Sequence, residues 1–475
     1  MSRNSVLRRV LSKAASVVFV VSAILFFRSY SEAGLLYVLN DDSTGSRIYG
    51  FQVNESTGAL TALAGFPVAT GGTGGTGLVC ERMAIDVVNR RLFVVNDGAD
   101  TVSAYSIDPS TGALTAMPFS PIAIGTGTWN AMAIHPNGSP LVISNGATGG
   151  GAVSLNITAT TATPATGSPF SLGAATAFSN TFSSNGNYYY TGGNTGTAFA
   201  GFSVDAATGV LTPLAGSPFS SGQTGPLAYA MDPSGRLFVL NSVDFAIRVF
   251  TTSSGIPSGV TGNPFTSGLT QRRDGLMHNN NNFYIVAGNS GNNVGVYQIA
   301  GTGAGTTVTP VSGSPFPTGG TTANVLALNQ AGTFLFVGNR LSRNITTFAF
   351  NPSTGVLSGQ TVQASNTMGT TGAVNGIGYL PDSLVVNAQI SGRITNAAGL
   401  GIAKVYVQLT SMDASVRRLA LTNAFGYYSF PSVQTGTTYT LTPTRRAYTF
   451  SPTSIVRNHT GDAVDLNFIG SPDKP

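Results

Sequence analysis

The twelve residues "TGVLTPLAGSPF" (208–219) recur in variant form along the chain, and this repeat decides the architecture. Related stretches read "TGALTALAGFPV" (57–68), "TGALTAMPFSPI" (111–122), "ATPATGSPF" (162–170) and "TVTPVSGSPF" (307–316). Most of them join a Thr-Gly turn to a Ser-Pro-Phe or similar segment, and they return roughly every fifty residues, a period typical of stacked supersecondary units.

Each repeat also contains short apolar runs in a fixed order, and one of these runs ends in or near Asn. The seven runs are "LYVLN" (36–40), "LFVVN" (92–96), "LVISN" (141–145), "YYYTGGN" (188–194), "LFVLN" (237–241), "YIVAGN" (284–289) and "LFVGN" (335–339). Runs this short, rich in β-branched and aromatic residues, indicate strands. Seven four-stranded units predict an all-β fold, a seven-bladed β-propeller over residues 34–384.

The recurring turn residues have structural explanations. Gly112 in "DPSTG" and Gly209 in "DAATG" are expected in the left-handed conformation of a hairpin between the third and fourth strands. Pro cannot donate to a β-ladder, so the "GSPF" segments are predicted on the outermost strand. The stretch 372–383 follows the seventh blade as an extra innermost strand, and we expect it to complete the first blade and close the ring.

The pattern changes after the propeller. Residues 385–475 contain about seven short alternating runs separated by Gly turns, among them "TYTLTPT" (438–444) and "AVDLNFIG" (463–470). This pattern predicts a small β-sandwich of immunoglobulin-like or transthyretin-like form.

The N-terminus has the features of an export signal. Basic residues precede the apolar run "AASVVFVVSAILFF" (14–27), and "SEA" before Gly34 resembles a cleavage site. An uncleaved anchor is the alternative, but the run is shorter than the about 20 residues needed to span a bilayer. Residues 1–33 are therefore predicted to be removed. The mature protein is then expected outside the cytoplasm (secreted, periplasmic or on the cell surface), with no membrane span.

Charge and cysteine content exclude several classes of function. Five basic residues and one acidic residue fall within residues 1–33, so the remainder carries a net charge of only +1. Nucleic-acid binding is therefore not predicted. Cys80 is the single cysteine, which rules out an intrachain disulfide and a cysteine-based zinc site. Neither a metal nor another cofactor is predicted.

The repeat motifs resemble the lactonase-type propellers, a family related to 6-phosphogluconolactonase and to surface-layer propellers with YVTN repeats. The resemblance rests on "YVLN", "FVVN", "HPNG" (135–138), "DPSG" (232–235) and the repeated tails. The stretches "ISGRITNAAGLGIAKVYVQL" (390–409) and "TNAFGYYSF" (422–430) resemble carboxypeptidase regulatory-like domains, which are typically non-catalytic. The propeller resemblance implies lactone hydrolysis. The propeller departs from the expected family pattern in having no Lys, and His135 and His278 lie in turns expected opposite the pocket.

Seven charged residues map to the propeller face formed by the loops that enter innermost strands and those that follow second strands: Glu81, Arg82, Asp97, Arg272, Arg273, Asp274 and Arg340. If the protein is a hydrolase, the catalytic candidates are Glu81, Asp97, Arg273 and Asp274. A carboxylate would activate water as general base, and Arg273 would stabilise the oxyanion.

The ligand-binding candidates are Arg82, Trp129, Asn130, Arg272 and Arg340. Trp129 could stack on a sugar ring, with packing in the core as the alternative. Ion pairs between blades are the alternative for the charged residues. The Asn that ends the second strands is expected to be structural, because Asn readily bonds nearby backbone.

Two functions follow from these observations. The favoured one is an exported recognition or scaffold protein, which binds a glycan, another ligand or a cell-surface or extracellular protein on one propeller face. The tail sandwich would serve as a spacer or adhesion module. The alternative is a lactonase-type hydrolase that opens a sugar lactone or another lactone at the mouth of the central channel.

Overall fold

The computed structural model describes residues 33–473 except 76–78, 80, 148, 272–273, 382–386, 412–415, 435–436 and 460–462. The chain divides into two compact units, Met1–Asp382 and Ser383–Pro475. Of the predicted signal segment, residues 1–32 lie outside the described residues, and Ala33 is the first residue of β1 (Ala33–Asp41). Within them, no helix is long and apolar enough to cross a bilayer.

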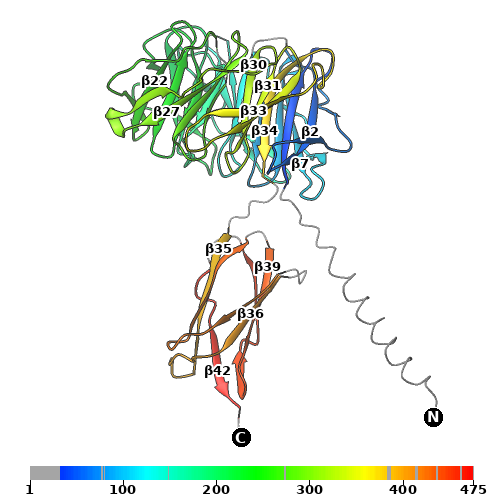
Figure 1. Cartoon of the computed structure of the whole chain (residues 1–475), viewed down its shortest axis with the longest axis vertical. Coiled ribbons are helices and arrows are strands. Elements are labelled where there is room, and N and C mark those ends of the chain that lie inside the picture. Colours follow the sequence, from blue (N-terminus) through cyan, green and yellow to red (C-terminus); the bar gives the residue numbers. More distant parts are fainter. Residues whose placement is uncertain are drawn as a thin grey trace, which may run out of the picture. The chain divides into compact units, whose positions relative to one another are not determined.

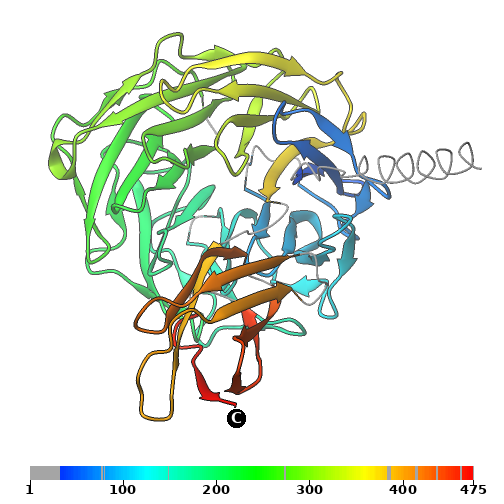
Figure 2. The ribbon, with the colours of Figure 1, turned by 60° about the horizontal axis from the view of Figure 1, so that its bottom comes forward.

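The first unit is a ring of seven antiparallel sheets, which confirms the predicted propeller (Figures 1 and 2). We number the blades from the one that contains the first strand. The innermost strands are, from blade 1 to blade 7, β34 (Ala373–Leu380), β5 (Met83–Asp86), β10 (Trp129–Ile134), β15 (Ser179–Phe182), β20 (Pro226–Met231), β25 (Gly275–Met277) and β30 (Ala323–Leu328). The second strands are β1 (Ala33–Asp41), β6 (Arg91–Asn96), β11 (Leu141–Asn145), β16 (Tyr188–Gly192), β21 (Arg236–Asn241), β26 (Phe283–Gly288) and β31 (Phe334–Asn339).

The outer part of each blade is built from a long third strand and short outer pieces. The third strands are β2 (Arg47–Asn54), β7 (Thr101–Ile107), β12 (Gly151–Ile157), β17 (Ala198–Val204), β22 (Ala246–Ser253), β27 (Asn293–Ala300) and β32 (Asn344–Phe350). The fourth strands are β3 (Leu60–Ala62), β8 (Leu114–Ala116), β13 (Ala162–Pro164), β18 (Leu211–Pro213), β23 (Ile256–Gly259), β28 (Thr307–Pro310) and β33 (Leu357–Val362). Two short 3-10 turns, η1 (Asp97–Ala99) and η2 (Gly303–Gly305), lie in loops.

The Pro-containing segments form a second outer piece in blades 1 to 6. These pieces are β4 (Val68–Ala69), β9 (Ile122–Ala123), β14 (Phe170–Ser171), β19 (Phe219–Ser220), β24 (Phe265–Thr266) and β29 (Phe316–Pro317). Each pairs with the first residues of the third strand, whereas the fourth strand pairs with residues nearer its end. The Pro-Phe segments thus lie at the outer edge, as predicted, on a separate piece of strand.

Ring closure follows the predicted scheme. Strand β34 pairs antiparallel with β1, from Leu35 opposite Leu380 to Asp41 opposite Ala373. In Figure 1 the yellow β34 lies beside the blue strands of blade 1. A C-terminal strand therefore completes the N-terminal blade.

The propeller core consists of seven apolar clusters, one between each pair of adjacent blades. Between blades 2 and 3, for example, Phe93 and Val95 pack with Leu141 and Ile143. Burying apolar surface between blades is the main stabilising term of such a ring. The ring is therefore stabilised mainly between sheets, because each blade presents apolar residues to both neighbours.

The second unit is a β-sandwich of two four-stranded sheets, as predicted. One sheet has the order β38 (Tyr427–Gln434), β35 (Asn387–Thr395), β42 (Phe468–Pro472) and β40 (Tyr448–Ser451). The other has the order β37 (Arg417–Leu421), β36 (Tyr406–Ser411), β39 (Thr437–Thr444) and β41 (Ile455–His459). Alternate residues of β36, such as Val407 and Leu409, are buried in a shared core with Ile390 and Phe430 of the opposite sheet.

Candidate active site

The innermost strands of blades 2 to 6 surround a cavity of about 350 Å³. Its described wall consists of Glu81 and Met83 together with residues 132–134, 180–182, 229–231 and 274–277. Two of the predicted catalytic residues, Glu81 and Asp274, are the acidic groups of this wall. Most of the remaining wall is apolar, so both carboxyl groups are in a poorly solvated place.

Glu81 spans from blade 2 to blade 4. It lies just before β5, and its carbonyl accepts the Met132 N–H at 2.8 Å. The Ser179 hydroxyl donates to Glu81 Oε1 at 2.5 Å, and the Asn180 N–H donates to Oε2 at 2.8 Å. The free edge of an innermost strand presents N–H groups without ladder partners, and the Glu81 carboxylate satisfies one of them.

Asp274 plays a similar part between blades 6 and 7. It directly precedes β25, its carbonyl accepts the Ala287 N–H at 3.0 Å, and Oδ2 accepts the Leu326 N–H at 2.7 Å. Burial raises the pKa of Asp274 to about 7, although hydrogen bonds from the backbone N–H groups of Leu326 and Gly275 favour its charged form.

The two carboxyl groups also influence each other. Burial raises the pKa of Glu81 well above its usual value, and the negative charge of Asp274 raises it further. The hydrogen bonds from Ser179 and Asn180 oppose this rise. Because two interacting carboxyl groups titrate as a pair, the pair holds a proton to higher pH than two exposed carboxyl groups would. A carboxyl pair that shares a proton can act as general acid and general base.

Arg82 and Asp97, the next two predicted residues, belong to a separate network. Arg82 Nη1 lies 2.6 Å from Asp41 Oδ2, and Nη2 lies 2.9 Å from Asp97 Oδ2. The Arg82 side chain is only 1% exposed. Its ion pairs join blade 1 to blade 2, and the guanidinium is not open to a ligand in this structure.

Trp129 is packed against the same network. Its ring belongs to the apolar cluster between blades 2 and 3. The backbone N–H of Trp129 donates to Asp97 Oδ1 at 2.6 Å, and the indole Nε1–H donates to Asp100 Oδ1 and to the Gly125 carbonyl. The residue is 3% exposed. The structure therefore gives the ring no open face on which a sugar could stack.

The other predicted ligand-binding residues are dispersed. Asn130 is buried at an irregularity of β10, and its Nδ2 has no hydrogen-bond partner among the described residues. Arg340 is buried beyond the end of β31, next to a smaller hollow over blade 1. Arg272 and Arg273 lie outside the described residues, so the oxyanion role assigned to Arg273 stays a prediction.

The histidines of the propeller have packing roles. His278 stacks on Phe350 with ring centroids 4.4 Å apart, and its Nε2 contacts the Gly332 carbonyl at 2.8 Å. His135 contacts Phe182 edge-on, and burial lowers its pKa. Among the described residues, no group of three or more His, Cys, Asp or Glu side chains could hold a metal ion.

Sequence reasoning missed Asp41, Ser179 and Asn180. A signal for Asp41 exists, because Asn40-Asp41 and Asn96-Asp97 are the same doublet at the end of two successive second strands. Both Asp side chains bond Arg82. No comparable local pattern marks Ser179 and Asn180. They contact Glu81 because the closed propeller brings the innermost strand of blade 4 close to the start of blade 2's innermost strand.

Comparisons with known proteins agree with this fold. Residues 236–374 match the family model described as lactonase, 7-bladed beta-propeller, and residues 389–469 match the carboxypeptidase regulatory-like domain. The resemblance to both families is therefore confirmed over these two segments of the chain. No curated protein matches the chain.

Several solved structures are similar to the propeller. A putative 6-phosphogluconolactonase from Bacteroides fragilis has a TM-score of 0.58 at 14% identity, covering 74% of this chain and 99% of that one. A putative 6-phosphogluconolactonase from Bacteroides uniformis has a TM-score of 0.56 at 13% identity, covering 74% and 100%. A periplasmic gluconolactonase from Pseudomonas aeruginosa has a TM-score of 0.56 at 14% identity, covering 74% and 100%. At such identities the likeness shows the fold alone.

Proposed function

We propose that the protein is a lactone hydrolase whose active site is the central cavity. The observation that carries this proposal is the pair of buried carboxyl groups, Glu81 and Asp274, in one cavity of a lactonase-type propeller. The scaffold or adhesion role favoured by the sequence has no support in the fold comparisons, and it stays a prediction.

The carboxyl pair can supply both proton transfers of the reaction. One carboxylate takes a proton from water as the water oxygen bonds to the lactone carbonyl carbon. The bond from that carbon to the ring oxygen then breaks, and the proton held by the other carboxyl group passes to the ring oxygen. Lactone and water become a hydroxy acid, and the pair ends with the one proton that it held at the start.

Asn180 is a candidate to stabilise the negative charge that develops on the carbonyl oxygen. It lines the cavity, and its Nδ2 has no hydrogen-bond partner among the described residues. A fixed amide donor in a water-poor site stabilises an oxyanion strongly. Because the described wall is acidic and apolar, it favours an uncharged lactone over a phosphorylated one.

The test is acid release by the purified protein from uncharged sugar lactones, an acyl lactone and a phosphorylated sugar lactone. Glu81→Gln and Asp274→Asn should each lower kcat/KM about 100-fold or more. Asp205→Asn is the matched control, because Asp205 lies in an exposed turn and Asn keeps the acceptor oxygen. Turnover no faster than the spontaneous rate, or unchanged turnover in both cavity variants with intact folding, would overturn the proposal.

We further propose that this reaction takes place outside the cytoplasm. The support is the predicted export signal of residues 1–33 together with the fold shared with a periplasmic gluconolactonase. Fractionation of cells that express the full chain tests this proposal, and retention of the protein in the cytoplasm would contradict it.

A further inference from the structure

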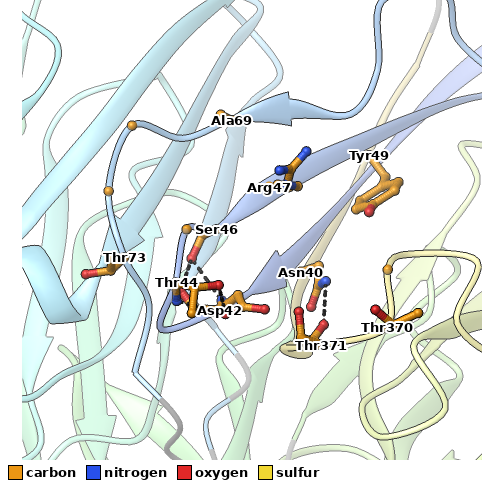
Figure 3. Close-up of a pocket in the computed structure, with 14 residues that line it drawn as sticks. Asn40, Asp42, Thr44, Ser46, Arg47, Tyr49, Ala69, Thr73, Thr370 and Thr371 are labelled. Atoms are coloured by element: carbon orange, nitrogen blue, oxygen red, sulfur yellow. Dashed lines mark hydrogen bonds between the residues drawn. The ribbon is translucent and has the colours of Figure 1, made fainter.

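A second and larger hollow, of about 620 Å³, lies over blade 1 (Figure 3), and its wall shares no residue with the described wall of the central cavity. Its walls come from the end of β1, the start of β2, the end of β4 and the loop that leads into β34. Segments near residues 40 and 370 thus meet around one space. The hollow depends on ring closure, because the loop 369–371 is part of its wall.

The side chain of Asn40, at the end of β1, is held in place by two hydrogen bonds. Asn40 Nδ2 donates to the carbonyls of Met368 at 2.6 Å and Thr371 at 2.9 Å, and the residue is buried. Asn40 Oδ1 is also buried, and it has no hydrogen-bond partner among the described residues. The two bonds that Asn40 donates hold the loop before β34 against the end of β1, and this contact shapes the wall of the hollow.

Asp42 is the acidic group of the hollow. Its Oδ1 accepts from both the backbone N–H and the hydroxyl of Thr44 at 2.8 Å (Figure 3). Hydrogen bonding from the Thr371 hydroxyl, and then from Thr44, lowers the pKa of Asp42 below its usual value, and the charge of Arg47 adds to this. Asp42 is therefore a charged acceptor at neutral pH.

Arg47 and Tyr49 supply donors on another side. Arg47 is exposed, and its positive charge balances that of Asp42 across the hollow. Tyr49 is half-buried, and burial raises the pKa of its hydroxyl, which stays protonated. The hollow thus presents acceptors, donors and one aromatic ring, with no net charge from this pair.

We propose that this hollow binds a neutral, hydroxyl-rich ligand, namely a sugar ring of a glycan, independently of the central cavity. Hydroxyl groups both donate and accept, so they match a wall that alternates acceptors with donors. The fixed charge of Asp42 disfavours an anion, and that of Arg47 disfavours a cation. The volume is within the usual range for small-ligand sites.

Isothermal titration calorimetry tests this proposal with neutral mono- and oligosaccharides as probes and with gluconate as the anionic comparison. At least one neutral saccharide should bind, and the double variant Arg47→Met/Tyr49→Phe should weaken its Kd at least 10-fold. The matched control Arg417→Met/Tyr406→Phe, which changes exposed residues of the sandwich, should leave the Kd unchanged.

Two further results separate this site from the proposed hydrolase. Glu81→Gln should still bind the saccharide, and Arg47→Met/Tyr49→Phe should keep its lactone turnover. The absence of binding by every neutral saccharide up to 10 mM (about 3 kcal/mol of binding free energy) would overturn the proposal. A preference for gluconate, or unchanged binding by the double variant, would overturn it as well.

Discussion

A single buried charge, that of Arg82, joins two blades of the propeller through ion pairs. Arg82 is surrounded by Asp41, Asp97 and the Gly75 carbonyl, and two of these contacts are ion pairs. Only 9% of the residues of the chain are charged. Burying a charged group destabilises the folded state unless the charge is paired. The ion pairs connect blade 1 and blade 2 at the point where the chain first passes from one to the other.

Replacing Arg82 with Met should destabilise the propeller by about 3 kcal/mol or more, because Asp41 would stay buried without its cation. Urea unfolding followed by tryptophan fluorescence measures this loss, since Trp129, the single tryptophan, lies in the propeller. Arg248→Met is the control. Its partner Asp244 is 25% exposed, so the loss should be smaller. Equal losses for both variants would contradict the structural role of Arg82.

Asp274→Asn should change the pH dependence of stability in a defined direction. The folded pKa of Asp274, about 7, exceeds the unfolded value of about 4, so the folded state keeps a proton that the unfolded state has released. The wild type should therefore lose stability relative to Asp274→Asn as pH rises from about 4 to about 7.

Urea midpoints of the two proteins at several pH values measure this difference. Asp205→Asn provides a control of opposite sign, because hydrogen bonds in its exposed turn lower the pKa of Asp205. The free energy of unfolding of the wild type should rise slightly relative to that of Asp205→Asn as pH rises through the acidic range. A constant difference between wild type and Asp274→Asn at all pH values would refute the assigned pKa.

At the scale of the strand, the residue before Pro explains why the tails repeat. Five third strands have an N–H between their two outer partners, and the side chain before Pro accepts it. The pairs are Ala104 with Ser120 (2.9 Å), Ser154 with Ser168 (3.1 Å), Gly201 with Ser217 (3.0 Å), Val249 with Asn263 (2.9 Å) and Val296 with Ser314 (3.0 Å). The Ser-Pro pair thus combines an acceptor for the third strand with a residue that cannot donate to a neighbour.

Ser168→Ala should cost about 1–3 kcal/mol, because the buried Ser154 N–H would lose its acceptor. Ser168→Asn should recover most of this loss, since blade 5 uses Asn263 at the equivalent place. Urea unfolding followed by Trp129 fluorescence reports the change within the same blade. A loss for Ser168→Ala below about 0.3 kcal/mol would show that the hydrogen bond is not needed.

At the scale of the whole propeller, Glu55 reinforces the seam where the ring closes. The Tyr379 hydroxyl of β34 donates to Glu55 Oε1 at 2.8 Å, and Asn329 Nδ2 of blade 7 donates to Oε2 at 2.8 Å. One side chain from the first blade therefore binds both the closing strand and the last blade. Local sequence gives no reason to expect this role for a Glu in a hairpin turn.

Glu55→Ala should destabilise the propeller by about 1–3 kcal/mol, because both hydrogen bonds to a charged acceptor are lost. Glu55→Gln keeps one acceptor oxygen and should lose less. Fluorescence of Trp129 should show the shift. The second compact unit should keep its own unfolding midpoint, measured by circular dichroism. An equal shift of both units would contradict their independence.

Four features of the fold can be predicted from the sequence: the number of blades, the hairpin glycines, the closing strand and the tail sandwich. These features depend on local chemistry: Gly112 and Gly209 have the left-handed φ values of 71° and 72° expected for their turns. Short apolar runs at a fixed period indicate strands wherever they occur. The grouping of Glu81 and Asp274 on one face was also available from the repeat, because both precede innermost strands.

The hydrogen-bond partners of these residues depend on the tertiary structure and cannot be predicted from local sequence. Glu81 bonds Ser179 and Asn180, about a hundred positions away, because innermost strands of different blades meet at the channel. In the structure β16 ends at Gly192 and β26 ends at Gly288, so Asn194 and Asn289 lie beyond these two strands. The other five second strands include their Asn. A shift of one residue turns a side chain to the other face of a strand. Register and ring closure are long-range properties, so the repeat predicts the framework of this protein but not the hydrogen bonds that complete its candidate sites.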